Sequence, residues 1–127
     1  MTSLTSKQAA HILRVLLQHT RVALEANPQF TVANLAALLA VIEKPGATQP
    51  EVAQTLGGVD EAVLSRQLRY LRGKRQGVVQ SPLLPVVNLQ PLESDNRVNV
   101  VGLTPEGEEF AKELTAKLNR LLASALK

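Results

Sequence analysis

The stretch that most constrains the fold runs from Thr48 to Arg75 and contains two consecutive helix signals. Thr48 is a suitable N-cap, Glu51 three residues later completes a capping box, and Gly57-Gly58 ends the short helix. Asp60 then caps a second helix. The inward face of this second helix is predicted to carry leucines spaced four and three apart, namely Leu64, Leu68 and Leu71. Two helices joined by a glycine turn predict a helix-turn-helix motif whose second helix is the recognition helix.

The opposite side of the second helix is predicted to be polar and basic. At about 100° per residue, Arg66 and Arg69 fall opposite the leucines, with Ser65 beside them. Residues 66–75 contain no acidic residue and five basic ones: Arg66, Arg69, Arg72, Lys74 and Arg75. The chain carries +3 in total, so removing the five charges of this run leaves −2 for the rest. A basic surface on a mildly acidic body is typical of a protein that binds a polyanion, although a solvated arginine face is the plainer alternative.

Length and composition limit the other possibilities. A chain of 127 residues is expected to form a single domain, 1–127, with a core of its own. Apolar residues make up 45% and aromatic residues only 2%, so leucine, valine and alanine must build the core, which favours helices. The absence of cysteine excludes disulfides and thiolate metal sites. Neither a secretion signal nor an apolar run long enough to span a membrane is recognised, so we expect a soluble, cytoplasmic protein without membrane contact.

Long helices are predicted at both ends of the chain. The first, 6–26, is expected to be capped by Ser6 or Ser3 and has one narrow polar stripe, so more of its surface is apolar than a monomer can cover. The last, 105–126, begins after Thr104 and repeats apolar residues such as Phe110 and Leu114 along one side. We expect these helices to pair and to form the interface of a homodimer. Packing within a monomer is the alternative for each.

The segments between these helices predict a helix and a small antiparallel hairpin. Thr31 caps a helix running from Val32 to about Glu43, with expected core positions Leu35, Ala36, Leu38, Leu39 and Ile42. Residues 77–81 and 97–103 are predicted to pair around a turn at 93–96 and to form a wing, 77–103, on the helical body 31–75. Between them, residues 82–92 hold three prolines and six large aliphatics, which argues against a central strand. This segment could pack on the body, cover the hairpin edge, or bind a partner.

Two histidines are considered as site residues. His11 lies in the polar stripe of the first helix and is expected to be solvated, whereas His19 lies among apolar positions. A hydrogen-bonded structural role is the preferred interpretation for His19, with an interface or a ligand pocket as alternatives. Two histidines eight residues apart with no cysteine make a poor metal site, so no metal or cofactor is predicted.

The order of several short motifs resembles the MarR-type winged-helix transcription regulators. The motifs are Thr48-Gln49-x-Glu51-Val52-Ala53, Ser65-Arg66, Asp95-x-Arg97 and Leu103-Thr104-x-x-Gly107. The resemblance covers roughly residues 28–115. It implies a homodimer, joined through its N- and C-terminal helices, that binds pseudo-palindromic double-stranded DNA, and we expect a repressor. It also implies that Ser65 and Arg66 contact DNA from the recognition helix and that Arg97 does so from the wing, with Asp95 holding the wing.

The chain departs from this family in the wing, at the start of the recognition helix and at its C-terminal end. Residues 82–92 are expected to be an insertion, the acidic pair Asp60-Glu61 opens the recognition helix, and one final helix stands where the family has two. Many relatives bind phenolic ligands, but no aromatic-lined pocket is predicted here, so a small-molecule effector is left unassigned. The alternative function is a protein-interaction module that docks through the apolar segment 82–92. An enzyme is not favoured, because no nucleophile–base pair or phosphate-binding loop is found.

Overall fold

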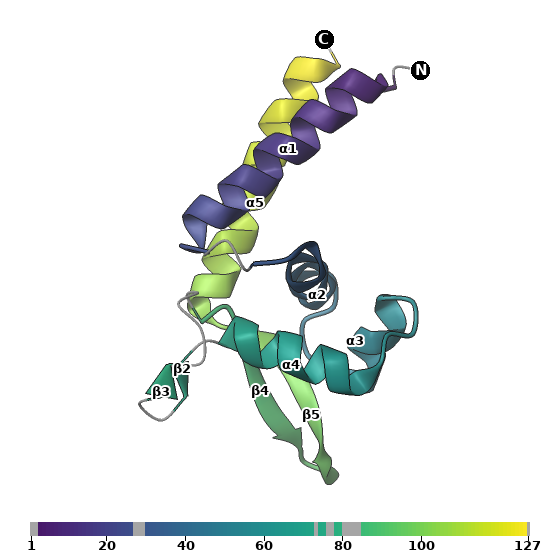
Figure 1. The fold of residues 1–127 in the computed structure, drawn as a ribbon, viewed down its shortest axis with the longest axis vertical. Coiled ribbons are helices and arrows are strands. Elements are labelled where there is room, and N and C mark those ends of the chain that lie inside the picture. The colour runs from purple at the N-terminus through teal and green to yellow at the C-terminus, as the bar shows by residue number, and fades with distance from the viewer. Residues whose placement is uncertain (1–2, 27–29, 73, 76–77, 80–84, 127) are drawn as a thin grey trace.

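The computed structural model describes residues 3–26, 30–72, 74–75, 78–79 and 85–126 (Figure 1). Its helices are α1 (Ser6–Ala23), α2 (Val32–Glu43), α3 (Gln49–Thr55), α4 (Glu61–Arg72) and α5 (Pro105–Ala125). A three-stranded antiparallel sheet has the order β1-β5-β4, formed by β1 (Ala47–Thr48), β5 (Asp95–Leu103) and β4 (Val87–Leu92). A separate pair joins β2 (Lys74–Arg75) to β3 (Val78–Val79). The predicted fold class, mainly helical with a small antiparallel hairpin, is confirmed.

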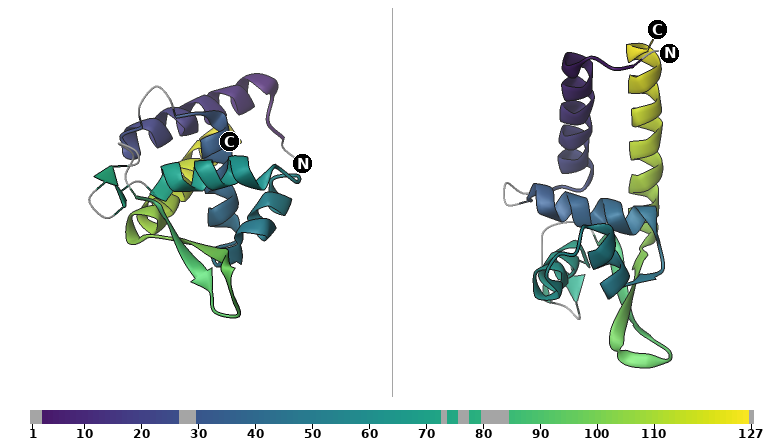
Figure 2. Two further views of the ribbon diagram at one scale, coloured as in Figure 1. Left: turned by 60° about the horizontal axis from the view of Figure 1, so that its bottom comes forward. Right: turned by 90° about the vertical axis from the view of Figure 1, so that its right-hand side faces the viewer.

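The molecule has a helical stalk at one end and a hairpin at the other (Figures 1 and 2). Helices α1 and α5 run antiparallel and form the stalk, so the two chain termini lie together at its far end. The Gln8 side-chain amide ties this end, because its Nε2 donates to the Ala125 carbonyl at 2.9 Å. Helices α2, α3 and α4 make up the body, and β4 with β5, here called the wing, projects on the side away from the stalk.

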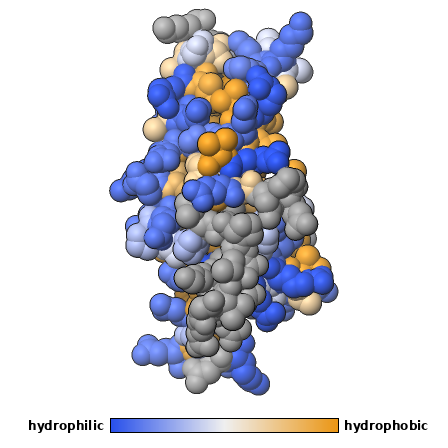
Figure 3. Space-filling view, turned by 60° about the vertical axis from the view of Figure 1, so that its left-hand side comes forward, coloured by the Kyte–Doolittle hydropathy of each residue, from blue (hydrophilic) through white to orange (hydrophobic). Residues whose placement is uncertain are grey.

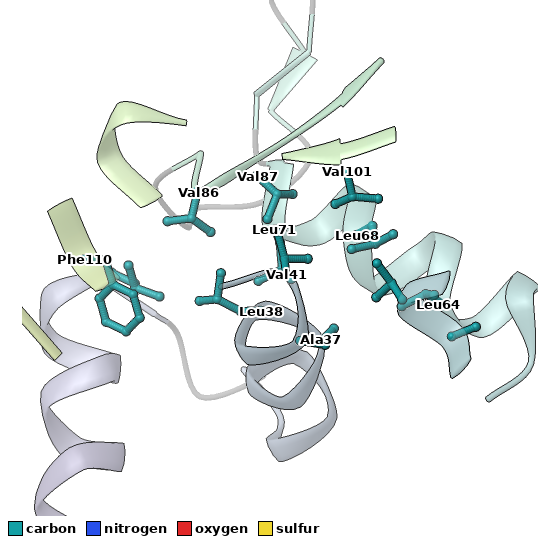
Figure 4. Packing of buried hydrophobic residues seen from close by; sticks show 14 of the residues in the cluster. Ala37, Leu38, Val41, Leu64, Leu68, Leu71, Val86, Val87, Val101 and Phe110 are labelled. Carbon is teal, nitrogen blue, oxygen red and sulfur yellow. The ribbon is translucent and has the colours of Figure 1, made fainter. Parts of the chain in front are cut away.

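The core lies between α2, α4 and the sheet (Figure 4). In Figure 4 the side chains of these elements point toward one another, and Phe110 of α5 joins them from the base of the stalk. The labelled members are Ala37, Leu38, Val41, Leu64, Leu68, Leu71, Val86, Val87, Val101 and Phe110, all buried. Helix α4 is therefore held by its leucine face against the most buried part of the molecule.

Most of the predicted helix caps are confirmed. Thr48 and Glu51 form the expected capping box at the start of α3, and Thr31 and Thr104 cap α2 and α5. The Asp60 carboxylate accepts the backbone N–H of Ala62 at 2.8 Å and that of Val63 at 3.2 Å, so it caps α4. The glycine turn after α3 is also present, with φ of 87° at Gly57 and 86° at Gly58. Such positive φ angles are adopted most easily by glycine.

The first helix differs from the prediction at both ends. Its N-cap is Thr5 rather than Ser3 or Ser6, because Gln8 completes a capping box with Thr5. The helix ends at Ala23 instead of residue 26: Glu25 takes a left-handed φ of 55°, and the Ala26 N–H closes on the Arg21 carbonyl at 2.8 Å. This turn satisfies a carbonyl at the helix end and lets the Leu24 side chain enter the core.

The predicted wing pairing is wrong. The partner of β5 is β4, inside the segment expected to be an insertion, and Val78–Val79 pairs with Lys74–Arg75 instead. Proline is tolerated in β4 because this strand lies at the edge of the sheet, and a register irregularity falls between Pro91 and Leu92. The strand β1, which pairs with β5 on its other side, was not expected from the sequence.

For the apolar segment 82–92, packing on the body was one of three alternatives, and the structure agrees with it at Val86 and Val87. Val86 and Val87 are completely buried in the core, and Val87–Leu92 forms strand β4. Residues 82–84 lie outside the described part of the chain. The described part of this segment therefore belongs to the core and to the wing. It offers little exposed aliphatic surface for a partner.

The inward face of α2 was predicted only in part. Leu38 is buried as expected, but Leu39 is exposed. The other buried positions are Asn34, Ala37, Ala40 and Val41. Leu35, Ala36 and Ile42 are half-buried. Helix α2 is apolar on nearly every side, so its sequence contains little information about which side faces the core.

Candidate nucleic-acid interface

Helix α4 turns one side to the core and the other to solvent. Leu64, Leu68 and Leu71 have 0% exposure. Arg66 and Arg69 are exposed and Ser65 is half-buried. These three polar residues define what we call the basic face. The orientation predicted from helical periodicity is confirmed, whereas DNA contact by these residues stays a prediction.

The other basic residues predicted to bind DNA lie at the end of α4 and in strand β2. Arg72 is half-buried at the end of α4. Lys74 and Arg75 form strand β2, which pairs with β3, but their side chains lie outside the described part. Arginines in the last turn of a helix also complement its negative end.

An ion pair fixes the turn of the wing. The Arg97 side chain is 91% exposed and its Nε lies 3.1 Å from Asp95 Oδ1. Asp95 also accepts the backbone N–H of Arg97 at 3.1 Å and its Nη2 at 3.3 Å. The guanidinium and the backbone N–H of Arg97 together lower the pKa of Asp95 below its ordinary value. The aspartate thus orients the arginine at the start of β5, one of the two strands of the wing.

A polar hollow of about 230 Å³ joins the recognition helix to the wing. It is lined by Gln49 and Pro50 at the start of α3, Glu61 and Ser65 of α4, and Arg97, Val98 and Asn99 of β5. Asn99 Nδ2 lies 3.5 Å from Gln49 Oε1, at the outer limit of a hydrogen bond. The hollow therefore brings the predicted site residues Ser65 and Arg97 to one surface.

Sequence reasoning missed Gln49 and Asn99 as members of this surface. The backbone explains their position: β1 pairs with β5, with Ala47 opposite Val101 and Thr48 opposite Val100, and the Gly46 N–H donates to the Val101 carbonyl at 2.8 Å. A two-residue strand has no recognisable periodicity. The only available signal was the position of Gln49 directly after the Thr48 cap.

The stalk leaves apolar side chains uncovered. Leu13 is 66% exposed, and Val22 and Val32 are each 72% exposed. Apolar surface gathers on the upper half of the molecule in Figure 3, the half that contains α1 and α5. A groove of about 360 Å³ lies between α1, α2 and α5; its lining is Leu13, Leu16, Leu17, Thr20, Val32, Leu35, Leu39, Leu114 and Leu118. A large exposed apolar patch marks an interaction surface.

The histidines of α1 lie in different surroundings. His11 is exposed, and its Nδ1 lies 3.2 Å from Arg14 Nη2. The ring of His19 stacks on Phe110 with 6.2 Å between centroids, which links α1 to α5, and its Nε2 is buried without a hydrogen-bond partner among the described residues. No group of three potential metal ligands is found in the described part of the chain. Within the same residues, every helix is too short or too polar to cross a bilayer.

Comparison with solved structures identifies similar folds. YusO of Bacillus subtilis is 20% identical with a TM-score of 0.65, over 95% of this chain and 76% of that one. Wild-type apo MarR of E. coli is 20% identical with a TM-score of 0.56, over 98% and 84%. The PcaV transcriptional regulator of Streptomyces coelicolor, solved with its natural ligand, is 21% identical with a TM-score of 0.53, over 95% and 80%. No family model and no curated sequence matches the chain.

These similarities extend over nearly the whole chain and include the stalk helices, the helix-turn-helix body and the wing. The order of elements in the structure agrees with the order of the motifs that first suggested the resemblance. The protein has the winged helix-turn-helix fold of the MarR-type regulators.

Proposed function

We propose that the protein is a sequence-specific, double-stranded DNA-binding transcriptional regulator that acts as a repressor in the cytoplasm. The observation that carries the proposal is the orientation of α4, which buries its leucines completely and exposes Arg66 and Arg69. A helix held in this way can enter the major groove without losing its anchor in the core. The proposal assigns no catalytic activity, cofactor or effector to the chain.

The proposed contacts divide into two kinds. Ser65 and Arg66 reach base edges in the major groove, where a bidentate arginine–guanine contact discriminates by about 1–3 kcal/mol. Phosphate contacts come from the remaining basic residues of the run, namely Arg69, Arg72, Lys74 and Arg75. Arg97, exposed and oriented by Asp95, extends from the wing toward the adjacent minor groove. The presence of Ser65 and Arg97 in one hollow supports this division.

A homodimer is proposed because the stalk exposes the apolar residues that a second copy would cover. Leu13 of α1 and Val32 at the start of α2 are more than half exposed, and both line the apolar groove between α1, α2 and α5. Joining two stalks would place two basic faces on one side of the assembly. Such a dimer would bind a pseudo-palindromic operator with half-sites about 34 Å, or one helical turn, apart.

The test begins with selection of bound sequences from a random DNA library, followed by affinity measurements on the preferred and on random DNA. We expect Arg66→Ala to weaken binding to the preferred sequence far more than to random DNA, and Arg75→Ala to weaken both alike. Arg120→Ala is the matched control, because Arg120 is exposed near the far end of α5. Equal losses on both DNAs for Arg66→Ala would contradict the base-reading role. No DNA binding even at low salt would contradict the function.

The alternative, a protein-interaction module that docks through residues 82–92, is not favoured. Burial of Val86 and Val87 removes two of its aliphatic side chains from the surface, and strand β4 occupies Val87–Leu92. The described part of the segment thus serves the core and the wing, whereas the docking hypothesis requires its aliphatic side chains to be exposed.

A further inference from the structure

An acidic residue lies beside the basic face and has no role in the contacts proposed above. Of the two acids that open the recognition helix, Asp60 is occupied as the cap of α4. Glu61 is exposed, and no described residue forms an ion pair with it. Arg97 lines the same hollow but pairs with Asp95. Glu61 lies in the first turn of α4, whose positive end favours a carboxylate, and it has no ion-pair partner among the described residues. It therefore presents a negative charge to the surface on which DNA is proposed to bind.

The position of Glu61 is that of a base-reading residue. Glu61 and Ser65 are four residues apart, one helical turn, and both line the hollow between α4 and the wing. In helix-turn-helix proteins the N-terminal residues of the recognition helix are those that contact base edges. If Ser65 reaches the bases, then Glu61 on the same side and one turn nearer the N-terminus reaches them as well.

The chemistry of the major groove limits what a carboxylate can bind there. A carboxylate only accepts hydrogen bonds, and phosphates repel it. Guanine offers two acceptors, O6 and N7, and the amino group of adenine lies beside the acceptor N7. Cytosine offers the N4 amino group, which is the donor that glutamate and aspartate contact in direct readout. Cytosine therefore gives the carboxylate a hydrogen-bond donor, and it places no acceptor of the same base beside that donor.

We propose that Glu61 is a specificity-determining residue that accepts a hydrogen bond from cytosine N4 in each half-site of the operator. This inference rests on the proposed DNA-binding function and deepens it. Arg66, which carries the opposite charge and lies further along the same helix, selects guanine in the same half-site. The two residues together make the recognised half-site rich in G·C pairs at the positions that α4 reads.

The test compares wild type and Glu61→Gln in selection from a random DNA library. Wild type is expected to enrich cytosine at one position of each half-site, with a preference on the order of tenfold over other bases. The glutamine amide pairs with adenine N6 and N7, so Glu61→Gln is expected to lose the cytosine preference at that position and to gain adenine there. Preferences at the other positions are expected to stay unchanged.

A uniform gain in affinity for all sequences in Glu61→Gln, with an unchanged preferred sequence, would overturn the inference and show that Glu61 only repels phosphate. A matched control for the loss of one negative charge is Glu108→Gln, in the first turn of α5 and outside the hollow. It is expected to leave the preferred sequence as it is. If the wild-type protein binds no DNA, the proposed function itself is contradicted. If the wild-type protein selects a preferred sequence and Glu61→Gln selects the same one, only this inference is contradicted.

Discussion

Gly107 lies where the first turn of α5 passes the backbone of Val86. A Cβ atom at Gly107 would lie 2.1 Å from the Val86 carbonyl oxygen, so no side chain fits without moving the backbone. The backbone of Val86 is fixed on both sides, because its N–H donates to the Leu71 carbonyl at 3.0 Å and its carbonyl accepts the Thr104 N–H at 3.2 Å. We expect Gly107→Ala to lower the free energy of unfolding by about 3 kcal/mol, as for a severe overpacking, measured by urea denaturation.

Gly102→Ala is the matched control for Gly107→Ala. A Cβ at Gly102 would lie 3.0 Å from the side-chain Oδ1 of Asn88, and a side chain of this kind can rotate away. The change is therefore expected to alter the free energy of unfolding by less than about 1 kcal/mol. Equal effects of the two substitutions would show that the backbone contact of Gly107 with Val86 is not what requires glycine.

The ion pair of the wing gives a pH dependence. Because Arg97 lowers the pKa of Asp95 in the folded protein, the stabilisation of the wing is fully present above the unfolded pKa, about 4, and is lost as pH falls through the lower folded pKa. Arg97→Gln is expected to return the pKa of Asp95 toward its ordinary value. NMR titration of the Asp95 carboxyl in the free protein measures the change. An identical titration in both proteins would contradict the pairing.

At the scale of the elements, the helices with strong local signals could be predicted from the sequence. Helix α4 has leucines on one side and arginines on the other, so its orientation followed from periodicity. The capping box of Thr48 and Glu51 is likewise local, since all its contacts lie within four residues. Where the signal was absent or ambiguous, as along the uniformly apolar α2, the inward side could not be predicted.

The wing strands could not be assigned correctly because their pairing depends on residues distant in the chain. Val78-Val79 and Val87 are equally good strand formers, and the sequence does not show that Val87 faces the core opposite Leu103. The three prolines of the segment argued against a central strand, and β4 is an edge strand, where a proline is tolerated. The hollow at the candidate site was missed for the same reason, since β1 places Gln49 beside Asn99 across fifty residues of sequence.

The cap of α3 connects the recognition motif to the wing and can be tested by substitution. Thr48 accepts the Glu51 N–H at 3.3 Å and lies opposite Val100 of β5. Thr48→Ala is expected to lower the free energy of unfolding by about 1 kcal/mol, the usual cost of losing an N-cap, measured by thermal unfolding. Thr115→Ala is the control, because Thr115 lies within α5 and bonds only the Ala111 carbonyl, so its removal is expected to cost less than about 0.5 kcal/mol. Equal costs would contradict the importance of the cap.

At the scale of the whole molecule, the stalk and helix α4 are joined through one buried core. Phe110 of α5 and the leucines of α4 belong to the same buried cluster, so the position of α5 constrains the position of α4. A second copy attached to the stalk would therefore also fix the distance between two recognition helices. Sequence specificity on a two-part operator depends on that distance as much as on the side chains of the basic face.

This dependence can be tested at Leu13, whose side chain is 66% exposed on α1. A glutamate there would bring a charge into the proposed interface and remove a leucine that the dimer would bury. The combined cost is at least about 3 kcal/mol, or about hundredfold in the dimer dissociation constant. We expect Leu13→Glu to be monomeric at concentrations where wild type is dimeric, by sedimentation equilibrium, and to bind the two half-sites independently. Gln18→Glu adds the same charge on the polar stripe of α1 and is expected to remain dimeric. Only a charge placed among the apolar side chains should separate the two copies. If both substitutions cause dissociation, or neither does, an interface formed by this side of the stalk is contradicted.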